Sequence, residues 1–362
     1  MISHARQLDE RHRERFFAVQ PRSLVGASPR EIGAALGALL YIPANRPQLT
    51  NDLARARQVG AAAVALDLED AVPVAERGAA VRAVTKVLLE HASFPLVFVR
   101  VPEPTDVRAI VGSLRAHGSS LTGFILPKFE ANARGREFFA EIRSGEENLG
   151  RRLLALPVVE TRAVAQRETR LDTLLDIRQL CREEEARVAG VRIGLTDLRA
   201  IFGMRARAGA SAYSSAVVAS VIGDIVNIFA RQGEDGAEAV PVAGGVLEQY
   251  GRESGVELAD EILADQANGL VGKSVIHPSH VPVVNAYAAV SEADHHDANA
   301  IVAKAAIGGA FASTRSTRMN EVAPHLPWAR LTLQRAAAFG VIRDGMARQE
   351  LAASLVRTLV KA

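Results

Sequence analysis

The sequence predicts an α/β protein built on a closed barrel of eight parallel strands and eight helices, with an extension at each end. Short apolar runs alternate with longer stretches of helical length across residues 37–290. This alternation indicates βαβ units and a parallel sheet. There are eight such runs, which favours a (β/α)8 barrel over an open doubly wound sheet. The length of 362 residues suits a barrel of about 250 residues with extensions.

The first 36 residues are predicted to form a helical N-terminal extension. Residues 1–30 carry charges of both signs, and we expect a charged helix followed by a loop that contains Pro21, Gly26 and Pro29. The start of the chain lacks the apolar core of a signal peptide.

The strands of the barrel are expected at the apolar runs, because parallel strands buried on both faces have nearly continuous apolar sequences. These runs are residues 38–42, 64–68, 96–101, 123–127, 153–159, 191–195, 240–246 and 270–276. Crossover helices are expected at residues 48–60, 75–91, 106–117 and 171–187. The seventh run is the least regular, since Pro241 and the pair Gly244 and Gly245 interrupt it.

Two further segments add to a minimal barrel. The connection between the sixth and seventh strands spans residues 197–239, and its apolar residues between Val217 and Phe229 recur with a helical period. We expect this stretch to pack as a helix. Residues 291–362 are predicted to form a C-terminal helical lid or oligomerisation region.

The C-terminal region should begin with a helix capped by Ser291, because acidic residues follow in its first turn. This helix is expected to run to about Phe311. A polar link at residues 313–320, followed by Pro324 and Pro327, should then lead into two more helical stretches.

Composition limits the classes of partner. The net charge of +2 provides no electrostatic basis for nucleic-acid binding. The most apolar stretch, residues 215–230, is shorter than the roughly 18 residues of a membrane span and contains Asp224 and Asn227. The single cysteine, Cys181, excludes an intramolecular disulfide and fits a reducing compartment. We therefore expect a cytoplasmic protein that acts on a small molecule and binds neither nucleic acid nor membrane.

Three carboxylates, Asp67, Glu69 and Asp70, directly follow or end the second apolar run. In α/β barrels the active site lies at the C-terminal ends of the strands. Carboxylates this close together repel one another unless a cation balances them. A solvated acidic turn has the same pattern. The absence of lysine and arginine between residues 60 and 76 favours a functional site.

Polar side chains occur at or near the ends of the other strands as well. They are Arg46, Arg100, Lys128, Glu160, Asp197 and Lys273. Glu160 and Asp197 each come after an apolar strand, and two oxygen ligands of this kind suit Mg2+, with Mn2+ as an alternative. An alternative interpretation of Arg100 and of Lys273 is that they only neutralise the acidic cluster. We expect Arg46, Arg100 and Lys128 to bind the substrate.

Several of these residues lie in sequence motifs that occur in the same order in the members of a known family. The motifs are residues 40–47 (LYIPANRP), 65–72 (ALDLEDAV), 99–101 (VRV), 123–128 (GFILPK), 159–161 (VET), 193–198 (IGLTDL) and 272–278 (GKSVIHP). The sequence resembles the citrate lyase β-subunit-like enzymes of the HpcH/HpaI aldolase superfamily, which are carbon–carbon lyases with a TIM-barrel fold. The resemblance covers residues 39–284. A finer similarity is to a lyase-like branch linked with bacterial stress-response gene clusters.

The resemblance implies that Glu160 and Asp197 hold Mg2+ and that Arg100 faces the carbonyl or carboxylate of the substrate. It implies that the acidic cluster orients metal-bound water and Lys273. The residues to which it gives catalytic roles are Arg100, Asp67, Glu69, Asp70 and Lys273. It also implies a homo-oligomer, a trimer or hexamer, in which the C-terminal tail closes over a neighbouring site. The insertion at 203–236, the charged N-terminal extension and the tail from Gly308 depart from the family pattern, and this leaves open whether a CoA thioester is the substrate.

The predicted function is a Mg2+-dependent carbon–carbon lyase or aldolase that acts on a small oxo- or hydroxy-acid or its thioester. Cleavage next to a carbonyl leaves an enolate, whose charge a chelated Mg2+ stabilises as a Lewis acid. Arg100 would add a fixed positive charge there. The general base is either metal-bound water held by the acidic cluster or a carboxylate of the tail.

Two alternatives stay open at this point. One is a metal-enolate enzyme that transfers a phosphoryl group, which would need a phosphate cradle from Gly244 and Gly245 or from the loop with Arg205 and Arg207. The other is a non-catalytic subunit on the same barrel that binds a metabolite or serves in assembly.

Overall fold

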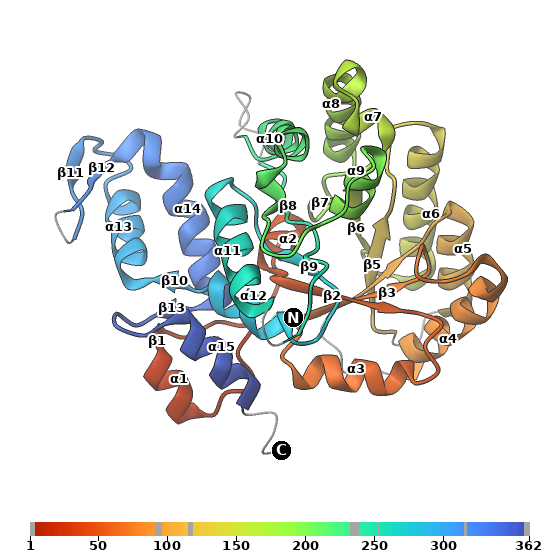
Figure 1. Cartoon of the computed structure of the whole chain (residues 1–362), viewed down its shortest axis with the longest axis horizontal. Coiled ribbons are helices and arrows are strands. Elements are labelled where there is room, and N and C mark those ends of the chain that lie inside the picture. Colours follow the sequence, from red (N-terminus) through yellow and green to blue (C-terminus); the bar gives the residue numbers. More distant parts are fainter. Residues whose placement is uncertain are drawn as a thin grey trace.

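The computed structural model describes residues 4–90, 96–114, 119–231, 239–251, 254–314 and 317–357. Within these residues a sheet of eight parallel strands forms the centre of the protein (Figure 1). Its strands are β2 (Ala38–Pro43), β3 (Ala63–Asp67), β4 (Leu96–Arg100), β5 (Leu121–Leu126), β6 (Leu154–Val159), β7 (Val191–Ile193), β8 (Val242–Ala243) and β9 (Lys273–Val275). Each strand lies within one of the eight predicted runs or within two residues of it.

The sheet closes into a barrel. Its strand order is β8-β7-β6-β5-β4-β3-β2-β9, so β8 and β9 are the two ends. A parallel bridge between Gly244 and Lys273 joins these ends. The backbone N–H of Ser274 donates to the carbonyl of Gly244 at 3.0 Å, and that of Val271 donates to Val242 at 2.8 Å. The predicted (β/α)8 barrel is confirmed, including the irregular seventh strand, which is only two residues long.

Helices surround the barrel in the expected places (Figure 1). They are α3 (Leu49–Gln58), α4 (Arg77–Glu90), α5 (Pro104–Leu114), α6 (Ala133–Leu149), α7 (Arg162–Ala165), α8 (Arg167–Glu183), α9 (Leu195–Ile201), α10 (Ala216–Phe229), α11 (Ser254–Ala267) and α12 (His280–Ala288). The predicted ends of two helices, at residues 91 and 115–117, lie outside the described residues. The helix predicted from the apolar period in the insertion is confirmed as α10, whose apolar side is buried.

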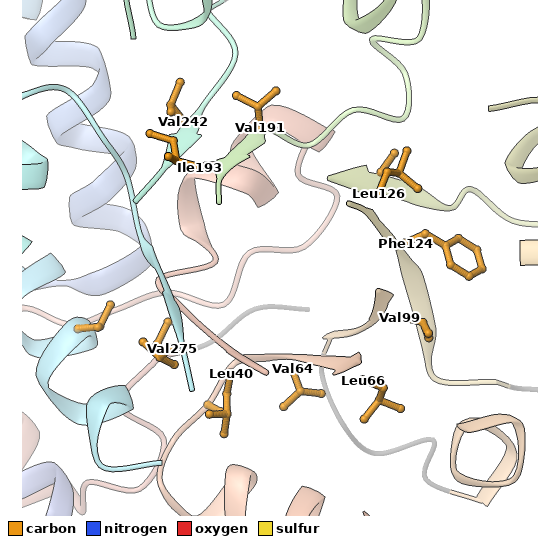
Figure 2. Packing of buried hydrophobic residues seen from close by; sticks show 14 of the residues in the cluster. Leu40, Val64, Leu66, Val99, Phe124, Leu126, Val191, Ile193, Val242 and Val275 are labelled. Atoms are coloured by element: carbon orange, nitrogen blue, oxygen red, sulfur yellow. The ribbon is translucent and has the colours of Figure 1, made fainter. Parts of the chain in front are cut away.

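The barrel separates two layers of core. Alternate side chains along each strand point to opposite faces. Figure 2 shows one set, including Leu66, Val99 and Val275, projecting outward from the ring of strands into the layer beneath the helices. The other set, including Phe98 and Leu156, fills the inside of the barrel. Polar residues at strand ends are therefore carried on a rigid, close-packed support.

The two extensions are joined by a small sheet of order β1-β13-β10. The N-terminal elements are α1 (Glu10–Phe16), β1 (Phe17–Val19) and α2 (Pro29–Ala35), and the C-terminal elements are β10 (Val290–Ser291), α13 (Glu292–Ala303), β11 (Ala310–Ala312), β12 (Met319–Glu321), α14 (Val322–Phe339), β13 (Val341–Ile342) and α15 (Arg348–Arg357). Figure 1 shows α1 beside α15. The three-part division at residues 36/37 and 290/291 stays a prediction.

Three expectations for the extensions were wrong. The loop after the first helix contains α2, which begins with a capping box between Ser28 and Glu31. The helix capped by Ser291 ends at Ala303, about eight residues early, and a hairpin of β11 and β12 follows. Pro324 and Pro327 both lie inside α14. The helix tolerates Pro324 because this residue is in the first turn, where a backbone N–H needs no helical partner. Packing of Ala329 against α13 supports the part of α14 that Pro327 weakens.

No helix in the described part of the chain is long and apolar enough to cross a membrane.

Candidate active site

The acidic residues after β3 meet an arginine from the next strand. Asp67 ends β3 and lies directly opposite Arg100, the last residue of β4. The Nε and one terminal nitrogen of Arg100 each donate to a different carboxylate oxygen of Asp67, both at 2.6 Å. The backbone N–H of Glu69 donates to Asp67 as well, at 3.0 Å. Asp67 and Glu69 are 3% and 6% exposed, which excludes a solvated acidic turn for both.

Glu69 connects Arg100 to Lys128, which follows β5. One carboxylate oxygen of Glu69 lies 3.0 Å from Arg100, and the other accepts a hydrogen bond from the Lys128 ammonium. Burial raises the pKa of Glu69, although the charges of Arg100 and Lys128 oppose this. Burial is the largest influence on the pKa of Lys128 and would lower it, but the hydrogen bonds and negative charges of Glu69, Asp70 and Asp197 together raise the pKa above its ordinary value. Both cations therefore stay charged at neutral pH.

The Lys128 ammonium also lies 3.1 Å from Asp70 and 3.6 Å from Asp197. Its backbone has φ of 48°, a left-handed conformation that is unfavourable for a residue with a side chain. This conformation turns the Lys128 N–H towards Glu160, whose Oε1 accepts it at 2.9 Å. One lysine thus contacts acids from three connections of the barrel, those after β3, β6 and β7.

Glu160 follows β6 and is 3% exposed. A Cβ atom at position 194 would lie 1.7 Å from its Oε2, so only a glycine leaves room for this carboxylate. Asp197 lies in the first turn of α9, on the next connection around the barrel. Burial first, and then the negative charge of Asp197, raise the pKa of Glu160 to about 8. Asp197 is thus close enough for its charge to disfavour the ionised form of Glu160.

We call these seven residues the mouth cluster: Asp67, Glu69, Asp70, Arg100, Lys128, Glu160 and Asp197. Five carboxylates in it face two cations, which favours binding of a further cation. No group of three or more His, Cys, Asp or Glu side chains in the described ranges is arranged to ligate a metal. Mg2+ needs only one or two protein carboxylates, and water and substrate complete its octahedron. The oxygen donors of Glu160 and Asp197 fit that requirement.

Two predicted residues do not join the mouth cluster. Arg46 lies in the loop after β2 with its side chain half exposed, and it pairs with Asp52 of α3. Lys273 begins β9 and pairs with Ala38, the first residue of β2, whereas Asp67 pairs with Pro43 at the other end of that strand. The two ends are about 16 Å apart. The expectation that the acidic cluster orients Lys273 was wrong.

Lys273 instead forms a buried ion pair on the outer side of the barrel strands. Its side chain is 0% exposed, and its ammonium donates to Asp265 of α11 at 2.6 Å, with Glu261 at 3.9 Å. The hydroxyl of Tyr213 donates to the other oxygen of Asp265 at 2.9 Å. These contacts attach the insertion before α10 to α11.

Three residues near the mouth were not singled out from the sequence: Gly194, Tyr41 and Arg192. Tyr41 points into the barrel, and the guanidinium carbon of Arg100 lies 5.2 Å from the centre of its ring. Arg192 is in β7 and is 2% exposed. The sequence signal that could have identified Arg192 is an arginine within an otherwise apolar run that forms a buried strand.

A cavity of about 560 Å³ lies away from the mouth cluster. Residues 22–27, α2, α14 and the segment before β9 line it, among them Leu24, Trp328 and Leu331. It contains none of the mouth cluster residues.

Comparison with known proteins identifies relatives of the whole barrel. Residues 30–341 match the family model described as C–C bond lyase of the TIM-barrel fold. The protein CitE from Mycobacterium tuberculosis, solved with magnesium, acetoacetate and coenzyme A, is 25% identical. The match covers 84% of this chain and 99% of that one, with a TM-score of 0.55. No curated protein matches the sequence.

Two more distant structures share the fold. A citrate lyase from Burkholderia xenovorans LB400 is 20% identical, with a TM-score of 0.66 over 88% of this chain and 96% of that one. RipC from Yersinia pestis is 17% identical, with a TM-score of 0.50 over 70% of this chain and 95% of that one.

Proposed function

Because the chain belongs to the family of C–C bond lyases of the TIM-barrel fold, we propose that its mouth cluster cleaves or forms a carbon–carbon bond in a small oxo- or hydroxy-acid or its thioester, with Mg2+ as cofactor. The observation that supports Mg2+ as the cofactor is the proximity of two carboxylates, Glu160 and Asp197. Glu160 is buried, its pKa is raised to about 8, and Asp197 is a principal cause. A divalent cation between the two would remove this repulsion. The similarity to CitE, a protein solved with magnesium and acetoacetate, supports the assignment.

Glu160 and Asp197 would hold the metal. Bound there, Mg2+ would act as a Lewis acid on the carbonyl next to the bond that breaks. The N–H of Lys128 orients Glu160 by occupying its Oε1, and Gly194 leaves the space that Oε2 requires. The position of the metal ligand is thus set by two backbone features.

Arg100 would stabilise the negative charge that develops on the substrate oxygen. Its two bonds to Asp67 and its contact with Glu69 hold the guanidinium in one orientation. A fixed charge of this kind needs no reorganisation as the reaction proceeds. Asp67 and Glu69 therefore act by orienting Arg100 and Lys128.

Lys128 would bind a carboxylate of the substrate. Its side chain is 43% exposed, so a ligand can reach the ammonium from solvent. Its contact with Asp70 is on the solvent side, since the Asp70 side chain is 62% exposed. Exchange of that surface partner for a substrate carboxylate would cost little.

The structure does not favour the phosphoryl-transfer alternative. The N–H of Gly244 is used within the barrel, where it donates to Gly272 at 3.2 Å. The side chain of Arg205 is 91% exposed, and its contact with Glu248 is 3.8 Å long. These contacts give no support to a phosphate cradle at Gly244 or Arg205.

Titration calorimetry with Mg2+ and then with a panel of 2-oxo acids tests the proposal. We expect wild type to bind Mg2+, and Glu160→Gln and Asp197→Asn each to lose at least tenfold in affinity while remaining folded. Glu183→Gln on the surface of α8 is the matched control and should bind as wild type does. Cleavage of the hydroxy-acids related to the best ligands is then followed by product analysis.

If both site variants bind Mg2+ as tightly as wild type, the ligand assignment is wrong. If wild type binds no metal, the non-catalytic alternative replaces the lyase.

A further inference from the structure

A buried arginine lies inside the barrel, directly below the mouth cluster. Arg192 is the middle residue of β7 and pairs with Val158 of β6, two residues before Glu160. Two residues of a strand span about 7 Å. At 2% exposure, Arg192 is among the largest side chains that the fold buries completely. It lies beneath the place where the substrate is proposed to bind.

The partners of this guanidinium are neutral hydroxyls. Nε and one terminal nitrogen donate to Oγ of Ser274 at 3.2 and 2.9 Å. The hydroxyl of Tyr41 lies within hydrogen-bonding reach of Arg192. Within the described residues no carboxylate forms an ion pair with it. Its charge is thus solvated by two hydroxyls and balanced by no acid.

Burying a charge without a counter-ion costs free energy, and an apolar side chain of similar size usually fills such a space more favourably. Ser274 on β9, whose hydroxyl Arg192 contacts, has a small side chain that leaves room for the long Arg192 side chain. The barrel interior could therefore have been filled by an apolar side chain. An anionic ligand above it would supply the missing negative charge.

Tyr41 connects this buried charge to the mouth. A guanidinium only donates hydrogen bonds, so the Tyr41 oxygen accepts from Arg192. The hydroxyl proton of Tyr41 is then left free to donate to another group. Tyr41 is half-buried, precedes the mouth-level residue Pro43 by two positions in β2, and carries Arg100 over its ring.

We propose that Tyr41 binds a carboxylate of the substrate at the floor of the mouth, and that Arg192 is a positioning residue that turns the Tyr41 hydroxyl towards it and adds a fixed positive charge beneath it. This inference rests on the proposed function and narrows its substrate to acids with a free carboxylate that reaches the floor. A ligand whose carboxylate is masked as an ester or amide would lose both effects.

The test compares each acid with its methyl ester, in the presence of Mg2+, by calorimetry and by kinetics. The variants are Tyr41→Phe, Arg192→Met and Arg192→Lys. For Tyr41→Phe and Arg192→Met we expect the preference for acid over ester to fall at least tenfold and KM for the acid to rise by a similar factor. Arg192→Lys should keep part of the preference, because it retains the charge.

Mg2+ affinity measured without any acid should change by less than threefold in these variants. Leu114→Met, a conservative change in the buried face of α5, controls for general effects of core substitution and should keep the wild-type preference. Urea unfolding of every variant confirms that the comparison is made on folded protein. Tyr41→Phe removes one oxygen atom only, so it serves the test if Arg192→Met does not fold.

The inference is overturned if Tyr41→Phe prefers the acid over the ester as strongly as wild type, since the hydroxyl then touches no carboxylate. An unchanged preference in folded Arg192→Met would overturn the role of Arg192. Failure of the proposed function has a different result. Wild type would then bind no Mg2+, and any preference for acids that Tyr41→Phe abolishes would still mark an anion site at the floor.

Discussion

Replacing Gly194 with alanine is expected to disable the Glu160 carboxylate without changing that residue. Gly194 has φ of −89° and ψ of 80°, which an alanine can adopt, so the change acts through space alone. The new Cβ would lie 1.7 Å from Oε2 of Glu160 and 2.6 Å from its Cβ. Both distances are far below van der Waals contact. Either the Glu160 side chain or the backbone at position 194 must move.

The size of the effect follows from the packing. Forcing an extra methyl group into a filled core costs about 1–3 kcal/mol. If Glu160 rotates away to relieve the strain, the metal site loses one of its two carboxylates. The same 1–3 kcal/mol, lost from the free energy of Mg2+ binding, corresponds to about a 5- to 150-fold weaker affinity.

Calorimetric titration with Mg2+ and urea unfolding of Gly194→Ala measure the two costs separately. Gly223→Ala in α10 is the control, because a Cβ there meets no atom within 4 Å. It should leave Mg2+ affinity unchanged and stabilise the helix by about 0.5–1 kcal/mol. Wild-type Mg2+ affinity and stability in Gly194→Ala would refute the reasoning. The double variant with Glu160→Gln should bind no more weakly than Glu160→Gln alone, since both changes remove the same ligand.

Two further predictions concern stability. Lys273→Met leaves Asp265 buried beside Glu261 without its cation, and we expect a loss of about 3–5 kcal/mol in urea unfolding, with unchanged Mg2+ affinity in the folded fraction. A loss below 1 kcal/mol would show that this ion pair does not stabilise the fold. Burial lowers the pKa of His4 from 6.5 to about 4, so the unfolded chain gains a proton first as pH falls. The free energy of unfolding should therefore decline between about pH 6.5 and pH 4, by about 3 kcal/mol from this residue. His4→Phe, which keeps the stacking on Phe339, should remove that part of the decline, and equal slopes in both proteins would contradict the assignment.

The positions of the strands followed from the sequence because parallel strands in a barrel are buried on both faces and have apolar sequences. The same rule placed Asp67 and Arg100 at adjacent strand ends, where they form a bidentate pair. Prediction from sequence patterns was least successful for the N- and C-terminal extensions. There, α2 and the β11–β12 hairpin are too short to show a period, α2 packs on the distant α14, and the two hairpin strands are mostly exposed and have no alternating apolar pattern.

Lys273 and Arg192 show why the candidate site could be predicted only in part. Both are cations in short strands with apolar neighbours, and the sequence does not show which face of the strand each occupies. A shift of one residue reverses the direction of every side chain. In the structure Lys273 points outward to Asp265, whereas Arg192 points inward to Ser274.

The sequence by itself determined the barrel, its family and the chemical types of residue at the strand ends, because these depend on local apolar patterns and on the parallel direction of the strands. Only the tertiary structure decided which charged groups share the mouth. It brought the Lys128 ammonium to acids from separate connections, made room for Glu160 at Gly194, and put Arg192 under Tyr41. These contacts join residues far apart in the chain, and they depend on strand register, side-chain direction and one left-handed backbone residue that no local sequence pattern specifies.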